Sequence, residues 1–117
     1  MTTAAQALNP DSSGNVYVST AAGLRGIVAP DWLGIEAPFT SPPTIDGERA
    51  DGVRVTPDGT LEWIVGNIGD IPVVELAPGN YNAVGWSLVV TYDGSLQVTN
   101  DSTGRTVVIG LYQVEAR

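Results

Sequence analysis

Residues 84–99 read V-G-W-S-L-V-V-T-Y-D-G-S-L-Q-V-T, and this stretch decides the class of fold. Side chains two residues apart point to the same face of a β-strand. The apolar side chains that follow this spacing are Val84, Trp86, Leu88, Val90 and Tyr92. The pattern predicts a long strand with one face against a core, and Asp93-Gly94 predicts a tight turn into a second strand over residues 96–99.

Turn and strand signals continue on both sides of this stretch. Pro57-Asp58-Gly59 separates two apolar runs, and the polar run N-D-S-T-G-R does the same at residues 100–105. We therefore predict an all-β protein, with a small antiparallel β-sandwich or barrel formed by a meander of hairpins in residues 51–117. The strands expected in it cover residues 52–56, 61–65, 71–76, 84–92, 96–99 and 106–115.

The last expected strand differs from the others because apolar side chains occupy both of its faces. Burial on both faces is typical of a central strand. We expect either a central strand of the sandwich or an interface strand in an oligomer. The residues concerned are Val107, Val108, Ile109, Leu111, Tyr112 and Val114.

The first fifty residues hold five of the eight prolines and show no sustained period of a strand or a helix. We expect residues 1–50 to form an extended N-terminal arm with short strands at residues 15–19 and 25–29. Residues 30–43 are expected to be too rich in proline to sustain a ladder. The arm either wraps across the sheet of its own domain or docks on a neighbouring subunit. Its residues that require burial are Trp32, Leu33, Ile35 and Phe39.

The charged composition excludes most enzyme chemistry. Five arginines against thirteen carboxylates give a net charge of −8, and lysine, histidine and cysteine are absent. There is thus no thiolate, imidazole or Schiff-base lysine, and no zinc site of the usual kind. The negative charge repels nucleic acid and anionic membranes, so we expect neither as a partner. No apolar run has the length of a signal peptide or a membrane span, which predicts a soluble chain made in the cytoplasm.

Acidic turns are the candidate metal ligands. Asn9, Asp11 and Ser13 have the 1, 3, 5 spacing that opens a calcium loop, with Gly14 at position 6, but Thr20 stands at position 12, where the loop needs a bidentate glutamate. We interpret this segment as an Asx-type turn that enters a strand. The Asp-Gly pairs elsewhere are explained as turn formers, so we expect no metal and no cofactor.

Paired carboxylates are the remaining route to catalysis, as in glycoside hydrolysis. Glu62 and Glu75 lie on strands that we expect to be adjacent. However, outward charges on strands also keep sheets soluble, and a chain of this size has little left to build a substrate cleft. We therefore expect a protein that is not an enzyme.

Aromatic rings on a β-sandwich can stack on sugars, so they are the other candidate for a binding site. Trp63 and Trp86 fall in phase with aliphatic neighbours and are expected in the core. Trp32 and Tyr81 remain as the exposed pair, although Tyr81 is expected to fold its ring over the corner that it follows. A carbohydrate-binding β-sandwich module is accordingly an alternative function.

In layout the whole chain resembles structural proteins of tailed-bacteriophage virions, and capsid decoration proteins above all. The resemblance is carried by an uncharged N-terminal segment, D-S-S-G-N-V-Y-V at residues 11–18, a proline-rich crossing segment, and a small acidic β-domain rich in Gly, Ala, Val and Thr. The stretch L-A-P-G-N-Y at residues 76–81 is similar to corners of many β-sandwiches.

The resemblance implies a small, often trimeric structural protein on the capsid exterior that binds the lattice of major capsid protein and stabilises contacts between its subunits. It also implies that the N-terminal arm does the docking. A tail, fibre or connector component is the alternative in the same setting. From the burial argument, the arm and the interface strand are expected to supply the partner-binding residues Tyr17, Trp32, Leu33, Ile35, Phe39, Val108 and Tyr112.

Overall fold

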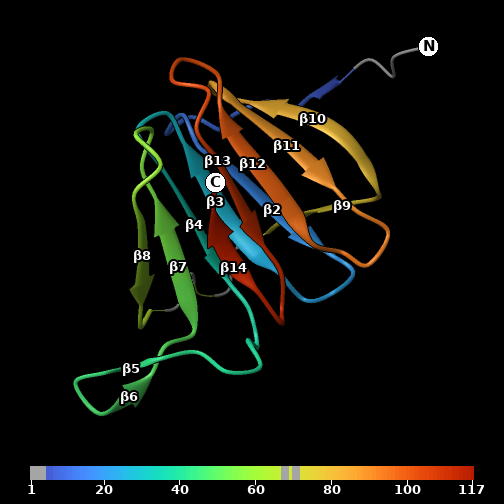
Figure 1. Cartoon of the computed structure of the whole chain (residues 1–117). Helices are drawn as coiled ribbons and strands as arrows, with labels where there is room; N and C mark the ends of the chain where they lie inside the picture. The colour runs from blue at the N-terminus through green and yellow to red at the C-terminus, as the bar shows by residue number, and fades with distance from the viewer. Residues whose placement is uncertain (1–4, 67–68, 70–71) are drawn as a thin grey trace.

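The structure is a computed structural model, and it describes residues 5–66, 69 and 72–117. Two six-stranded β-sheets, named here sheet A and sheet B, face each other, and a short hairpin projects from them (Figure 1). The expected all-β fold is confirmed. The described residues contain no helix, and therefore no helix that is long and apolar enough to span a membrane.

Sheet A holds the predicted antiparallel meander, which runs without interruption from β10 to β14. The strand order is β1-β10-β11-β12-β13-β14, and β1 is parallel to β10. Its strands are β1 Gln6–Ala7, β10 Gly79–Ala83, β11 Trp86–Val90, β12 Leu96–Asn100, β13 Thr106–Ile109 and β14 Val114–Ala116.

Sheet B has the strand order β8-β7-β4-β3-β2-β9, in which β2 and β9 are parallel and the other neighbours are antiparallel. Its strands are β2 Val16–Thr20, β3 Arg25–Ala29, β4 Trp32–Glu36, β7 Gly52–Val55, β8 Leu61–Ile64 and β9 Val74–Leu76. The projecting hairpin consists of β5 Thr44–Ile45 and β6 Glu48–Arg49. Residue 71, where a strand was expected to begin, lies outside the described residues.

Residues 16–36 form three strands of sheet B rather than part of an extended arm. Strand β4 lies between β3 and β7 and pairs with both, so residues on either side of the expected domain boundary share one sheet. The expectation that residues 30–43 sustain no ladder is corrected for β4. Pro30 and Asp31 make the turn out of β3, and no proline follows until Pro38, which leaves room for a five-residue strand.

The strand expected over residues 84–92 begins two residues later. Val84 and Gly85 form the turn between β10 and β11, with positive φ values of 40° and 93°. Two-residue hairpin loops often need this left-handed backbone at both positions, which asparagine, aspartate and glycine adopt more readily than valine. The Val84 side chain is partly buried and packs against the core. At the other end, Tyr92 lies in a turn.

The last expected strand is in fact two strands. Strand β13 ends at Ile109, the chain turns at residues 110–113, and β14 returns antiparallel along the edge of sheet A. The Gly110 N–H donates to the Gln113 carbonyl across this turn, 2.9 Å. The apolar residues on both faces of the sequence pattern therefore belong to a hairpin rather than to one doubly buried strand.

The inward faces of the two sheets form one core. Trp86 is the largest fully buried side chain, and its indole Nε1 donates a hydrogen bond to the carbonyl of Ala29 in sheet B, 2.9 Å away. The Thr20 hydroxyl, also buried, donates to the carbonyl of Gly94 in the turn between β11 and β12, 2.7 Å. The expected core position of Trp86 is confirmed, and Trp63 is half-buried against the same core.

One five-residue turn occurs four times within the described residues. The turns begin at Asp11, Thr20, Thr56 and Thr91. In each, the N–H of the fourth residue donates to the carbonyl of the first, and the N–H of the first donates to the carbonyl of the fifth. The fourth residue is always a glycine, with φ between 83° and 94°, because this position requires left-handed backbone. In the turn at Asp11, the carboxylate also accepts from two backbone N–H groups, which confirms the expected Asx-type turn.

Protonation of Asp58 and Asp93 is expected to weaken two of these turns. The pKa of each carboxyl is held below its ordinary value of 3.8, because it accepts a hydrogen bond from a threonine hydroxyl, Thr56 or Thr91, and another from the backbone N–H two residues on. A depressed pKa contributes stability above pH 3.8, and that contribution is lost as the pH falls through the folded-state pKa.

The check is urea unfolding above and below pH 3.8. We expect the Asp58→Asn/Asp93→Asn double variant to lose less free energy of unfolding on acidification than the native chain does. Asp31→Asn, which removes an exposed carboxylate elsewhere, is the matched control and should lose as much as the native chain. Equal losses in all three proteins would contradict the prediction.

Candidate docking surface

Three of the expected partner-binding residues lie inside the sandwich. Leu33, Ile35 and Phe39 are exposed by only 0%, 1% and 3%. The Phe39 ring meets Trp63 edge to face, with centroids 5.1 Å apart and an interplanar angle of 81°. These three side chains are therefore buried within the chain's own core. This agrees with the alternative in which the N-terminal segment packs on its own domain rather than on a neighbouring subunit.

The other four expected residues are divided between two surfaces. Tyr17 and Trp32 are half-buried on the outward face of sheet B. Val108 is half-buried on the outward face of sheet A, and Tyr112 is exposed in the turn between β13 and β14. The structure thus does not bring the seven residues together. Tyr17 and Trp32, the two aromatic residues of the N-terminal half that are half-buried, share the outward face of sheet B.

The Trp32 ring covers Gly34 on the outward face of sheet B. A Cβ atom at Gly34 would lie 2.8 Å from Cζ3 of Trp32, so only glycine lets the ring approach the strand this closely. The guanidinium carbon of Arg54 lies 5.2 Å from the centroid of the same ring, which is a cation–π contact. Trp32 is therefore positioned on both sides, by a glycine below it and an arginine above it.

A hollow of about 170 Å³ opens beside this ring. Gly34 and Gly52 contribute backbone without side chains, while Ile27 and Ile64 stand at its sides. A Cβ atom at Gly52 would lie 3.2 Å from Cγ1 of Ile64, so a larger residue there would crowd the hollow. The hollow has room for an apolar side chain of a partner. We name this surface, made of Tyr17, Ile27, Trp32, Gly34, Gly52 and Ile64, the sheet B face.

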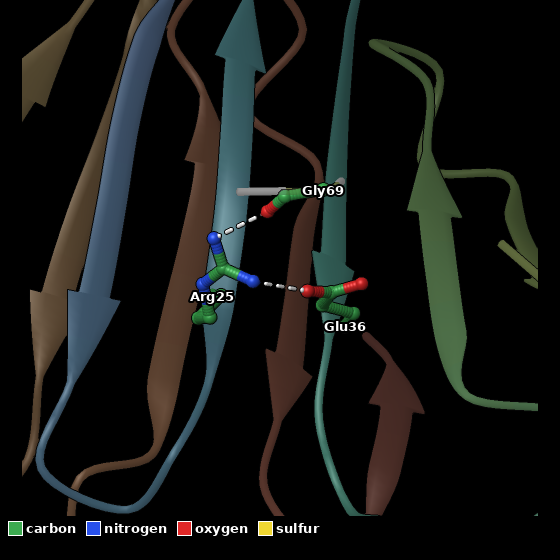
Figure 2. Close-up of polar contacts among 3 residues, drawn as sticks. All are labelled: Arg25, Glu36 and Gly69. Atoms are coloured by element: carbon green, nitrogen blue, oxygen red, sulfur yellow. Dashed lines mark hydrogen bonds and ion pairs between the residues drawn. The ribbon is translucent and has the colours of Figure 1, made fainter. Parts of the chain in front are cut away.

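One end of the sheet B face is fixed by a polar contact, shown in Figure 2. Arg25 of β3 donates from Nη1 to Oε1 of Glu36 in β4, 2.8 Å, and from Nη2 to the carbonyl of Gly69, 2.8 Å. The Arg25 and Glu36 side chains are 32% and 19% exposed, so they are partly shielded from water. One arginine thus connects two strands and the segment that follows β8.

Carboxylates also gather beside the edge strand β8 of sheet B. A second hollow, of about 770 Å³, lies between the β5–β6 hairpin and the edge strand β8. Its lining includes the acidic side chains of Asp46, Glu48 and Glu62 beside the apolar Trp63 and Ile64. The apolar sheet B face therefore has an acidic border, which favours a partner with basic groups at matching positions.

The candidate catalytic and sugar-stacking pairs do not assemble. Glu62 and Glu75 were expected on adjacent strands, but β8 and β9 are the two opposite edges of sheet B, with four strands between them. Tyr81 is 8% exposed, and its hydroxyl donates to the carbonyl of Ala77, 2.7 Å. It folds over its corner as predicted, so Trp32 and Tyr81 form no exposed platform.

Sequence reasoning missed part of the sheet B face. Ile27 lies on the outward face of β3, between the buried residues Gly26 and Val28. Ile64 lies on the outward face of β8, while Leu61 and Trp63 of that strand point inward. The available signal was the spacing of Trp32 and Gly34, two residues apart on one strand, because a glycine on an outward face often marks a close approach.

The sequence matches no protein-family model, no curated protein and no solved structure. The fold and the surface therefore define the class by themselves: a small acidic protein of two facing β-sheets with an apolar, acid-bordered outward face. No group of three or more metal-ligating side chains comes together within the described residues.

Proposed function

We propose that this protein is a non-enzymatic structural component of a tailed-phage virion, which binds the exterior of the assembled capsid and stabilises contacts between major capsid subunits. The observation that carries the proposal is the sheet B face. Its apolar side chains lie outside a core that is already filled by the inward faces of both sheets. Partly exposed tryptophan and isoleucine side chains on a strongly acidic protein are typical of a surface that binds another protein.

The sheet B face defines what the capsid surface must offer. Its hollow takes an apolar side chain, and the carboxylates of Asp46, Glu48 and Glu62 favour arginine or lysine around that side chain. The protein is proposed to self-associate, most simply as a trimer, because one protomer presents a modest area and several copies on a symmetric lattice bind together. Light scattering of the purified chain tests the oligomer, and a monomer would remove that part of the proposal.

The docking proposal is tested by co-sedimentation with capsids of the phage that encodes the chain. We expect Trp32→Ala to weaken capsid binding by at least about tenfold, because it removes a tryptophan at the centre of the face. Tyr92→Ala is the matched control, since Tyr92 is 98% exposed on a hairpin of sheet A. Thermal unfolding of both variants verifies that each is folded.

Two outcomes would contradict capsid docking. The first is equal binding by the native chain and by folded Trp32→Ala. The second is sedimentation with isolated tails and not with capsids, which would favour the alternative of a tail, fibre or connector component.

A further inference from the structure

A second surface lies on sheet A and shares no residue with the sheet B face. Tyr92 is 98% exposed in the turn between β11 and β12, and Tyr112 is 87% exposed in the turn between β13 and β14. Both tyrosines line one cleft of about 520 Å³. This volume falls within the roughly 300–1,000 Å³ typical of small-molecule sites.

The fold itself does not require an aromatic residue at position 92. Tyr92 is the second residue of the turn that occurs four times, and the equivalent residues in the other three copies are Ser12, Ala21 and Pro57. All four turns close with the same backbone hydrogen bonds. The ring of Tyr92 therefore contributes nothing that the turn needs, and its exposure calls for another explanation.

The cleft combines apolar surface with fixed polar groups. Val108 and Leu111 line the cleft together with the tyrosines, and Asp93, Ser95 and Gln113 supply hydrogen-bonding groups. Oδ1 of Asp93 accepts from the Thr91 hydroxyl and from the Ser95 N–H. These bonds fix the position of the carboxylate.

We propose that the cleft between Tyr92 and Tyr112 binds a neutral sugar ring. A pyranose has an apolar face of C–H groups that stacks on an aromatic ring, and hydroxyls at its edge that donate to a carboxylate and exchange hydrogen bonds with an amide. Stacking is assigned to the two tyrosines, and hydroxyl recognition to the Asp93 carboxylate and to the amide oxygen of Gln113, whose Nε2 donates to Glu115 Oε2, 2.6 Å.

Charge restricts the sugar to neutral forms. The described residues that line the cleft include no arginine, and Asp93 is the charged group among them. A uronic or sialic acid would bring a carboxylate next to this one inside a protein of net charge −8. The cleft therefore discriminates against acidic glycans.

Saturation-transfer NMR on the full chain tests this site. The probes are methyl α-D-glucopyranoside, methyl β-D-galactopyranoside and methyl N-acetyl-β-D-glucosaminide, with D-glucuronic acid as the acidic counterpart. We expect transfer from tyrosine ring protons to at least one neutral probe, and weaker or no transfer to the acid. Tyr92→Ala and Tyr112→Ala should each weaken binding about fivefold to tenfold. Tyr92→Phe, which keeps the ring, should bind as the native chain does.

We expect Tyr92→Ala to fold as the native chain does, because alanine already occupies the equivalent turn position at Ala21. The proposal is overturned if none of the three neutral probes receives saturation, if the alanine variants bind as well as the native chain, or if glucuronic acid binds equally. Transfer to an arginine-containing peptide in place of the sugars would also overturn it and reassign the cleft to protein docking. Capsid binding by Tyr92→Ala tests the sheet B face separately, because this variant changes the cleft and leaves that face intact.

Discussion

Replacement of Trp86 by alanine is expected to lower the free energy of unfolding by about 3–5 kcal/mol. Trp86 is 1% exposed, so the substitution leaves a cavity between the two sheets. It also removes the hydrogen bond from the indole Nε1 to the carbonyl of Ala29, which then lies buried without this donor. A loss of this size is a large fraction of the roughly 5–15 kcal/mol that holds a typical domain folded. Urea unfolding followed by far-ultraviolet circular dichroism measures it.

Trp86→Phe is the matched control, because it keeps an aromatic ring in the core and removes only the outer part of the indole with its donor. We expect it to cost less than the alanine variant, with about 0.5–1.5 kcal/mol due to the lost hydrogen bond to the Ala29 carbonyl. If Trp86→Ala unfolded at the same urea concentration as the native chain, the contact between the sheets would not depend on this side chain.

The central stretch shows why the class of fold could be predicted and its strand bounds could not. Alternation from Trp86 to Val90 predicts a strand with one buried face, and that is what β11 is. The pattern runs on through Val84 and Tyr92, which lie in turns because hairpin geometry overrides it at both ends. A valine with φ of 40° gives no turn signal, since asparagine or glycine is the usual residue there.

The candidate site was predictable only in part, because strand β4 is apolar on both faces. Trp32 and Leu33 are neighbours, so one of them must point outward, and a shift of one residue would exchange their roles. The register with β3 and β7 places Leu33 and Ile35 in the core and leaves Trp32 above Gly34. That register depends on strands distant in sequence, and composition suggested an arm because the prolines lie at the ends of β4 rather than within it.

Gly94→Ala is expected to destabilise the fold more than Gly14→Ala, although both glycines occupy the same position of the same turn. Their φ values are 84° and 83°, so the backbone cost of adding a Cβ atom, about 1–2 kcal/mol, is common to both. At Gly14 the new atom meets nothing within 4 Å. At Gly94 it would lie 2.6 Å from Cβ and 2.7 Å from the backbone nitrogen of Ala22, in the turn between β2 and β3.

The difference between the two variants isolates the contact between the sheets at this end of the molecule. Backbone cannot move aside as a flexible side chain can, so Gly94→Ala should cost a further 1–3 kcal/mol or so beyond Gly14→Ala. It should also disturb the hydrogen bond from the Thr20 hydroxyl to the Gly94 carbonyl, which ties the same two turns together. Urea unfolding of both variants gives the two free energies. Equal losses would mean that the turns at Thr20 and Thr91 do not pack as closely as the distances from Gly94 to Ala22 indicate.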